Sequence, residues 1–278
     1  MMHTFYKMNG LGNDFVVLDG RNSPPTLTQK QIQHFSERSV LGCDQFIALE
    51  PSDDADIFMR IYNQDGTEQS ACGNATRCVA KLIMDEKNTS ACKIATKAGI
   101  LHGNKVGEEI CILMGYPGFL WGKIPLARES NTFDMKNLLA IDCILHAGAV
   151  NIGNPHLVCQ VENLTDELVQ KHGPTLEKNN LFPEHTNVEF ITIPTPKTMR
   201  LKVWERGAGQ TKACGTGACG AVALHRKLGH VRDTVDVQMD GGSLTIHIDS
   251  DGRIHMQGDA NLDFTGQIDL QLATWTKT

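Results

Sequence analysis

Hydrophobic and polar residues alternate in short runs along most of the chain, a pattern typical of half-buried strands. The clearest runs are "DIFMRIYN", residues 56–63, and "MRLKVWE", residues 199–205. The same criteria predict further strands at residues 3–8, 15–19, 93–96, 100–104, 108–115, 144–153, 156–161, 188–193, 234–239, 243–248 and 253–258.

Four segments have the composition of helices. We predict helices at residues 28–38, where Thr28 is a suitable N-cap, and near 165–172. The other two, at 73–86 and at 215–228, are rich in small residues, and the second ends near Gly229. The stretch "GAVALH" is apolar on nearly every side, so we expect this helix to be buried within its sheet. The predicted fold class is α+β.

The chain also contains an internal repeat. "SACGNATRCVA" at residues 70–80 is matched by "KACGTGACGAV" at 212–222, and the cysteines Cys72 and Cys214 are 142 positions apart. Polar positions recur at nearly the same spacing: Asn13 with Asn154, Gln45 with Asn187, and Asn63 with Glu205. We therefore predict a duplicated unit and two lobes. The N-terminal lobe comprises residues 1–117 with about 264–278, the C-terminal lobe comprises 118–263, and "GYPGFLWGKIP" is the first crossing.

Composition narrows the class of protein. The chain has 278 residues and a net charge of −6, without a basic patch, which argues against nucleic-acid or anionic-membrane partners. The longest apolar runs are too short to span a bilayer, and the N-terminus lacks the pattern of a secretory signal. Nine scattered cysteines without a zinc spacing predict reduced thiols, no metal site and a cytoplasmic location.

The positions of Cys72 and Cys214 suggest their chemistry. Each stands at the start of a predicted helix, where unpaired backbone N–H groups and the helix dipole favour a thiolate, so we expect thiol pKa values below about 8.5. The amides at Gly73–Asn74 and Gly215–Thr216 are suited to bind a carboxylate. Cys78 and Cys219 lie inside the helices, where we expect them to be buried in the core.

Two such cysteines favour proton transfer over covalent catalysis, which needs only one thiol. If the lobes face each other, one carboxylate would lie between two helix starts, with a thiol on each side of the attached carbon. One thiolate could then remove a proton from that carbon while the other thiol returns one to the opposite face. The helix starts would stabilise the charge of the carbanion.

The motifs resemble those of a known family. "KMNGLGNDFVVLD", "CDQF", "NQDGTEQSACGNATRC", "GNPH", "ERGAGQTKACGTGAC" and "GGSL" are similar, in order, to diaminopimelate epimerase. The resemblance implies a pyridoxal-independent isomerase without a cofactor, interconverting LL- and meso-diaminopimelate for lysine and peptidoglycan synthesis. It also implies a homodimer whose subunits have two pseudo-symmetric lobes, each a curved, mostly antiparallel sheet around a central helix.

The resemblance further implies roles for individual residues. Cys72 and Cys214 become the acid–base pair, and His156 supports the reacting centre with Glu205 by orienting the ammonium group. The implied substrate contacts are Asn13, Gln45, Asn63, Gly73, Asn74, Asn154, Asn187, Glu205, Arg206, Gly215 and Thr216. Arg206 suits a bidentate clamp on the distal carboxylate of diaminopimelate, which an apolar amino acid lacks.

Two residues depart from the family pattern, and two alternatives remain open. Ala75 stands where glycine is more usual, and Cys43 stands where an aromatic residue is common, beside Gln45. The first alternative is a two-cysteine racemase of another amino acid, such as proline or histidine. The second is a non-enzymatic thiol protein that senses oxidation or holds a metal.

Overall fold

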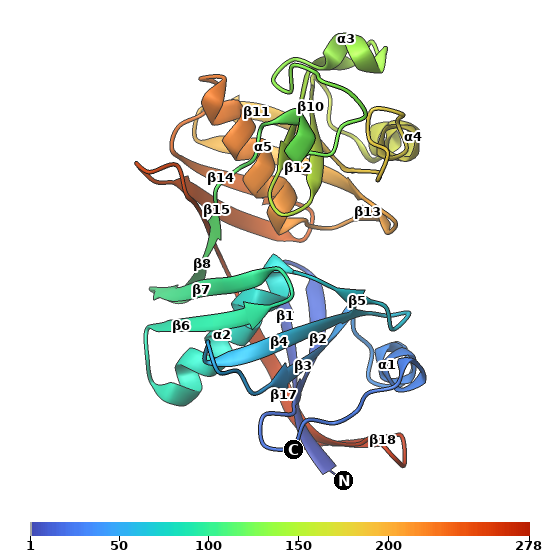
Figure 1. Cartoon of the computed structure of the whole chain (residues 1–278), viewed down its shortest axis with the longest axis vertical. Coiled ribbons are helices and arrows are strands. Elements are labelled where there is room, and N and C mark those ends of the chain that lie inside the picture. Colours follow the sequence, from blue (N-terminus) through green and yellow to red (C-terminus); the bar gives the residue numbers. More distant parts are fainter. Residues whose placement is uncertain (1) are drawn as a thin grey trace. The chain divides into compact units, whose positions relative to one another are not determined.

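The computed structural model describes residues 2–278 and divides the chain into two compact units. The first unit comprises Met1–Ile112 and Gly258–Thr278, and the second comprises Leu113–Gln257. Figure 1 shows a sheet and an enclosed helix in each. The elements of the first are β1 (Met2–Gly10), β2 (Asn13–Asp19), α1 (Gln29–Ser36), β3 (Gln45–Glu50), β4 (Ile57–Asn63), β5 (Glu68–Gln69), α2 (Gly73–Lys87), β6 (Ala91–Thr96), β7 (Gly99–Val106), β8 (Glu109–Gly115), β17 (Asn261–Asp269) and β18 (Thr274–Lys277).

The second unit follows the same plan from β9 onward. The chain leaves the first unit within β8 and returns to it at the end of β16. The elements between these points are η1 (Trp121–Lys123), α3 (Lys136–Leu139), β9 (Ile144–Asn151), β10 (Pro155–Val161), α4 (Asp166–Glu177), β11 (Asn187–Thr195), β12 (Thr198–Glu205), β13 (Gly209–Thr211), α5 (Gly215–Lys227), β14 (Thr234–Met239), β15 (Gly242–Ile248) and β16 (Ile254–Gly258).

The strand pairings of the two units repeat step by step. In the first, β1 pairs antiparallel with β2, β2 parallel with β3, and β3 antiparallel with β4. β4 then pairs antiparallel with β5 and parallel with β6, which pairs antiparallel with β7. In the second unit, β9–β10, β10–β11, β11–β12, β12–β13, β12–β14 and β14–β15 follow with the same directions. The predicted α+β class is confirmed, and this repeated topology matches the duplication inferred from the spacing.

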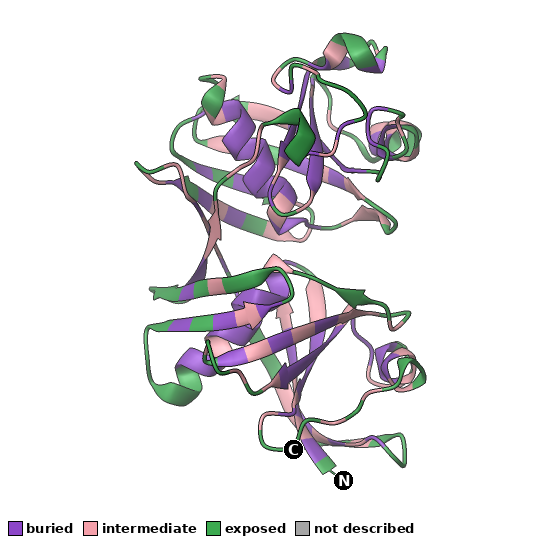
Figure 2. Cartoon of the chain, in the orientation of Figure 1, coloured by how far each residue is buried: buried purple, intermediate pink, exposed green. Residues whose placement is uncertain are grey.

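Small residues let the central helices approach their sheets closely. α2 packs on β1, β6 and β7, and α5 packs on β9, β10, β11 and β15. A Cβ added to Gly220 of α5 would lie 2.9 Å from Val150 of β9, and one added to Gly148 of β9 would lie 2.9 Å from Leu224. The expectation that this helix is buried is confirmed, since its residues from Gly217 to His225 are all buried (Figure 2).

A second hydrophobic layer in each unit includes the remaining helix, α1 or α4. Ile32 and Phe35 of α1 pack with Phe5 and Phe46 of the sheet, and Val169 and Leu176 of α4 belong to the corresponding cluster of the second unit. Thr28 begins α1 with a capping box, in which its hydroxyl accepts from the Gln31 amide and the Gln31 side chain accepts from the Thr28 amide.

Most predicted elements are present, with one clear difference in length. The sequence predicts a helix near residues 165–172, whereas α4 extends further, through Gly173 and Pro174. It continues to Glu177 because Trp204 lies against Gly173, where a Cβ would be 2.6 Å from the indole ring, and because Trp204 donates to the Glu177 carboxylate at 2.7 Å. Several elements were not predicted, namely β3, β5, β13, β18, α3 and η1.

Candidate active site

Cys72 and Cys214 occupy the same structural position in their units. Each is the N-cap residue of a central helix, with extended backbone angles of φ −149°, ψ 112° and φ −134°, ψ 109° respectively. Their carbonyl groups accept the first helical hydrogen bonds, from Thr76 at 2.9 Å and from Ala218 at 3.0 Å. The predicted helix-start position is therefore correct for both cysteines.

In the first unit, the predicted polar residues meet at one edge of the sheet. Asn13 begins β2, Gln45 begins β3, and Asn63 ends the antiparallel strand β4. Gln45 and Asn63 are register partners, and their amides are 3.4 Å apart. The side chain of Asn74, in the first turn of α2, donates to the side-chain oxygen of Asn13 at 2.7 Å. Sheet topology thus brings four carboxamides together near Cys72 and Gly73.

A cluster of charged side chains supports the sheet edge at Asn13. Lys7 and Arg38 both bind Asp14, the latter at 2.6 Å, and Arg38 also binds Asp44. The Asp44 carboxylate accepts from the Asn13 side chain at 3.3 Å. Burial raises the pKa of Asp14, but hydrogen bonds from Arg38 and Lys7 outweigh this effect and lower it. Asp14 therefore stays ionised and keeps its ion pairs with Lys7 and Arg38, and Asp44, which Arg38 also binds, holds the Asn13 side chain.

The second unit builds the equivalent edge from β10, β11 and β12. Asn187 begins β11, pairs in register with His156 of β10, and donates to the Pro155 carbonyl at 3.0 Å. Its side-chain oxygen accepts from the Arg206 amide at 3.0 Å. Glu205 ends β12, as Asn63 ends β4. The Arg206 side chain was expected to be buried, but it is exposed and donates to the Glu184 carbonyl at 3.1 Å.

Cys214 lies in a buried, negatively charged environment. Its sulfur is 3.5 Å from the Thr216 hydroxyl, and the carboxylates of Glu205 and Glu189 lie close enough for their charges to act on the thiol. Burial raises the pKa of Cys214 well above its usual value, and the charges of Glu205 and Glu189 raise it further. The expectation of a lowered thiol pKa is therefore wrong for Cys214, because the helix dipole is weaker than burial and two nearby carboxylates.

The pKa of Glu205 also differs from its usual value. Burial raises this pKa, while the hydrogen bond from the Thr211 hydroxyl offsets part of that effect. The negative charge of a nearby carboxylate stabilises the protonated form of a thiol. Glu205 therefore favours a proton on Cys214, which suits an acid in catalysis.

His156 lies at the centre of a buried chain of polar contacts. Its Nδ1 is 2.7 Å from the Glu189 Oε1 atom and its Nε2 is 2.8 Å from the Asn154 Oδ1 atom. His156 and Glu189 are both 0% exposed. Sequence reasoning missed Glu189, although a carboxylate among the apolar residues of "NVEFITI" was a signal of a buried polar role.

The two departures from the family pattern both lie in the core. Cys43 is 0% exposed, contacts Ser36 at 3.5 Å, and has a pKa raised by burial. Its side chain therefore packs with the α1 layer and is poorly reactive. Ala75 is buried in the first turn of α2. Cys78 and Cys219 are buried as predicted.

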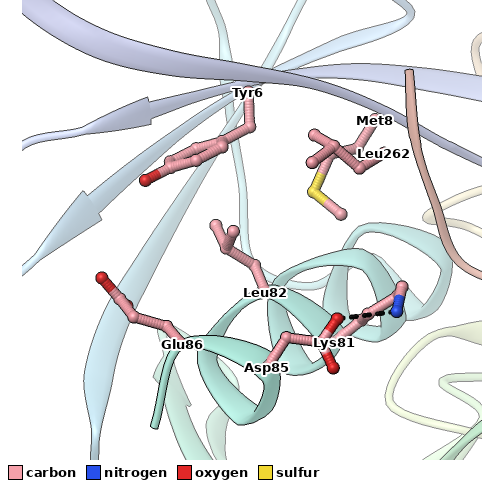
Figure 3. Close-up of a pocket in the computed structure, with 7 residues that line it drawn as sticks. All are labelled: Tyr6, Met8, Lys81, Leu82, Asp85, Glu86 and Leu262. Carbon is pink, nitrogen blue, oxygen red and sulfur yellow. Dashed lines mark hydrogen bonds and ion pairs between the residues drawn. The ribbon is translucent and has the colours of Figure 1, made fainter. Parts of the chain in front are cut away.

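A cavity of about 240 Å³ in the first unit lies apart from these residues (Figure 3). It lies between β1, β17 and the second half of α2, and the ion pair of Lys81 with Asp85 borders it at 2.7 Å. Apolar side chains provide most of its lining, and none of the predicted site residues reaches it. We therefore place the candidate site at the helix starts.

Within residues 2–278, no group of three or more His, Cys, Asp or Glu side chains has an arrangement that could hold a metal ion. No helix there has the length and apolar character needed to cross a membrane.

Comparison with known proteins agrees with the geometry. A sequence model of the family described as "Diaminopimelate epimerase" matches residues 5–119 and 148–262. A diaminopimelate epimerase of Phenylobacterium zucineum is 41% identical over 272 residues, covering 96% of this chain and 98% of the relative.

Solved structures share the fold at low sequence identity. A predicted epimerase from Pseudomonas aeruginosa has a TM-score of 0.68 at 16% identity, with 95% of this chain and 98% of that chain covered. A hydroxyproline epimerase from Agrobacterium vitis has a TM-score of 0.65 at 14% identity, with 96% and 92% covered. The matched sequence model and the 41% identical relative, each spanning most of the chain, establish that this protein belongs to the diaminopimelate epimerase family.

Proposed function

We propose that the chain interconverts LL- and meso-diaminopimelate by proton exchange at one α-carbon, with Cys72 and Cys214 as the acid–base pair. The observation that carries the proposal is the repeated arrangement of a thiol at a helix start beside a polar sheet edge. The sequence of a 41% identical diaminopimelate epimerase supports the substrate.

The proposed reaction needs one cysteine on each face of the α-carbon of the substrate. The thiolate of one cysteine takes the α-proton and becomes a thiol. The electron pair left on carbon is delocalised into the carboxylate, which the amides of Gly73, Asn74, Gly215 and Thr216 stabilise. The thiol of the other cysteine then gives its proton to the opposite face and becomes a thiolate.

The environments of the two thiols suggest their order of action. Because burial and the carboxylates of Glu205 and Glu189 raise the pKa of Cys214, we assign it the proton-donor role in the resting enzyme. Cys72 would then begin as the base. In the reverse reaction the roles exchange, since each turnover leaves the former base as a thiol and the former acid as a thiolate.

The remaining polar residues would bind the rest of the substrate. Asn13, Gln45, Asn63, Asn154 and Asn187 supply amides, and Glu205 supplies an acceptor for an ammonium group. Arg206 is exposed, with its backbone amide fixed by Asn187, so its guanidinium can turn toward a distal carboxylate. A distal carboxylate and ammonium distinguish diaminopimelate from proline.

Incubation with LL-diaminopimelate in heavy water tests the proposal. We expect deuterium at the inverted α-carbon and formation of the meso isomer, measured by chiral chromatography with mass spectrometry. L-proline and L-histidine are the controls for a related racemase, and turnover of either in place of diaminopimelate would contradict the assignment.

We also propose that the enzyme is a cytoplasmic homodimer. Family resemblance supports the dimer, and the exposed Leu262 beside the apolar cavity of the first unit is available for a subunit contact. Light scattering after size-exclusion chromatography should give about twice the chain mass of 30.5 kDa. A monomeric mass at micromolar concentration would reject the dimer.

A further inference from the structure

The pairing of His156 with Glu189 has no counterpart in the first unit. His156 is the register partner of Asn187, and Glu189 lies two residues beyond Asn187 on β11. The same two positions around Gln45 hold Phe15 and Ile47, and both side chains are fully buried. An apolar pair in the first unit is therefore replaced by a hydrogen-bonded polar pair in the second.

The carboxylate of Glu189 is held tightly against the first turn of α5. A Cβ added to Gly217, the third residue of that helix, would lie only 2.5 Å from the Glu189 Oε1 atom. The corresponding residue of α2 is Ala75. Glycine at 217 thus makes the space that the buried carboxylate occupies, next to the positive end of the helix.

Only one of the two Glu189 carboxylate oxygens has a hydrogen-bond partner among residues 2–278. Oε1 contacts His156, whereas Oε2 is buried and has no hydrogen-bond partner within residues 2–278. Burying a carboxylate is unfavourable unless it is paired, so its contact with His156 and its place beneath the helix start account for its presence. No solvent competes for this contact, because both side chains are fully buried.

We propose that Glu189 is a positioning residue that fixes the His156 ring and, through it, the Asn154 carboxamide of the substrate site. With Oε1 facing Nδ1, the ring cannot turn without leaving the carboxylate unpaired. The Nε2 atom of the fixed His156 ring then stays 2.8 Å from the Asn154 Oδ1 atom. This contact directs the amide nitrogen of Asn154 away from the histidine. This inference rests on the proposed function, because it concerns the same site.

The same carboxylate acts on Cys214 by its charge. The ionisable groups that face Cys214 in the second unit are Glu205 on β12, Glu189 on β11 and, through these carboxylates, His156 on β10. The charge of Glu205 acts more strongly on the thiol than that of Glu189, and both act in a buried environment, where screening by water is weak. Removal of the Glu189 charge should therefore favour the Cys214 thiolate.

The decisive variant is Glu189→Gln, which keeps the size of the side chain and removes its charge. The rate of Cys214 alkylation by iodoacetamide is measured against pH, and the modified peptide is quantified by mass spectrometry. We expect the midpoint of the rise in alkylation rate to move to lower pH, and kcat/KM for diaminopimelate to fall at least tenfold. Glu189→Asp, which keeps the charge but shortens the reach, should retain the alkylation midpoint and lose kcat/KM.

Glu177→Gln is the matched control, because Glu177 is a buried carboxylate of the same unit that accepts from Trp204 and the Gly207 amide. It should lower the melting temperature without moving the alkylation midpoint of Cys214. An unchanged midpoint in Glu189→Gln, or the same loss of kcat/KM in both glutamine variants, would overturn the proposal. Alkylation needs no substrate, so it reports on Glu189 even if the proposed reaction is wrong.

Should Glu189→Gln fail to fold, His156→Gln replaces it, and unimpaired kcat/KM in that variant would also overturn the proposal.

Discussion

The two units have the same topology but provide different surroundings for their cysteines. Cys72 is partly exposed and precedes Asn74, whose carboxamide binds that of Asn13, whereas Cys214 is 6% exposed and its pKa is raised by burial and by the carboxylates of Glu205 and Glu189. The positions of these two carboxylates are held by Asn63 and Ile47 in the first unit. The duplicated fold therefore surrounds its second cysteine with two acidic side chains that the first unit does not have at the same positions.

The two units also differ in the buried side chains of their sheets and central helices. Phe15 and Ile47 of the first unit correspond to His156 and Glu189 of the second, and Ile83 of α2 corresponds to His225 of α5. The two units keep the same topology despite these different side chains, because strand pairing and the small residues of the central helices specify the topology. The chemistry of each unit is specified by a few buried side chains.

The largest expected effect comes from removing either thiol. Cys72→Ala and Cys214→Ala should each lower kcat by at least roughly 10²–10⁴-fold, the range that a positioned acid or base contributes. Chiral chromatography of reactions in heavy water measures the loss. Cys78→Ala and Cys219→Ala are matched controls one turn or more into the same helices, and comparable losses there would indicate structural damage.

The second unit has His225 where the first unit has Ile83, and this histidine should make the stability of the protein sensitive to acid. Burial lowers the pKa of His225 to about 3, with His146 and His230 contributing, and its Nε2 lacks a partner within residues 2–278. Above about pH 6.5 the histidine is neutral in both the folded and unfolded states. Below that pH the unfolded chain binds a proton that the folded chain excludes, so stability falls by ~1.4 kcal/mol per pH unit until the pH nears 3.

His225→Ile tests this by giving α5 the residue of α2. Urea unfolding at pH 7 and pH 5 should show a smaller acid-induced loss of unfolding free energy in the variant than in the parent. The carboxylates of the chain contribute equally to both proteins, so the difference isolates His225. An identical loss in both would mean that His225 is protonated in the folded state.

A smaller effect is expected from exchanging the third helix residues. Gly217→Ala should destabilise the protein by about 1–3 kcal/mol despite the better helix propensity of alanine, because its Cβ meets the Glu189 carboxylate. Ala75→Gly meets no such group and should cost only about 0.5–1 kcal/mol. Urea unfolding of both variants measures the contrast, and equal costs would show that the carboxylate moves aside easily.

Much of the architecture is encoded locally. Alternation predicts β4 and β12, Thr28 predicts the start of α1, and Gly229 the end of α5, because these signals act over a few residues. The short strands β5 and β13 were not predicted, since two or three residues carry no periodic signal and depend on the strand beside them. The continuation of α4 past Pro174 depends on Trp204, which comes from a distant strand.

The sequence by itself determined the duplication, the two cysteines at helix starts and the family, because motifs and their spacing are properties of the chain. Only the tertiary structure decided the ionisation of Cys214 and the part played by Glu189. Those depend on burial and on charges supplied by two different strands, β11 and β12, and a pKa responds to the distances between such groups, which no local pattern specifies.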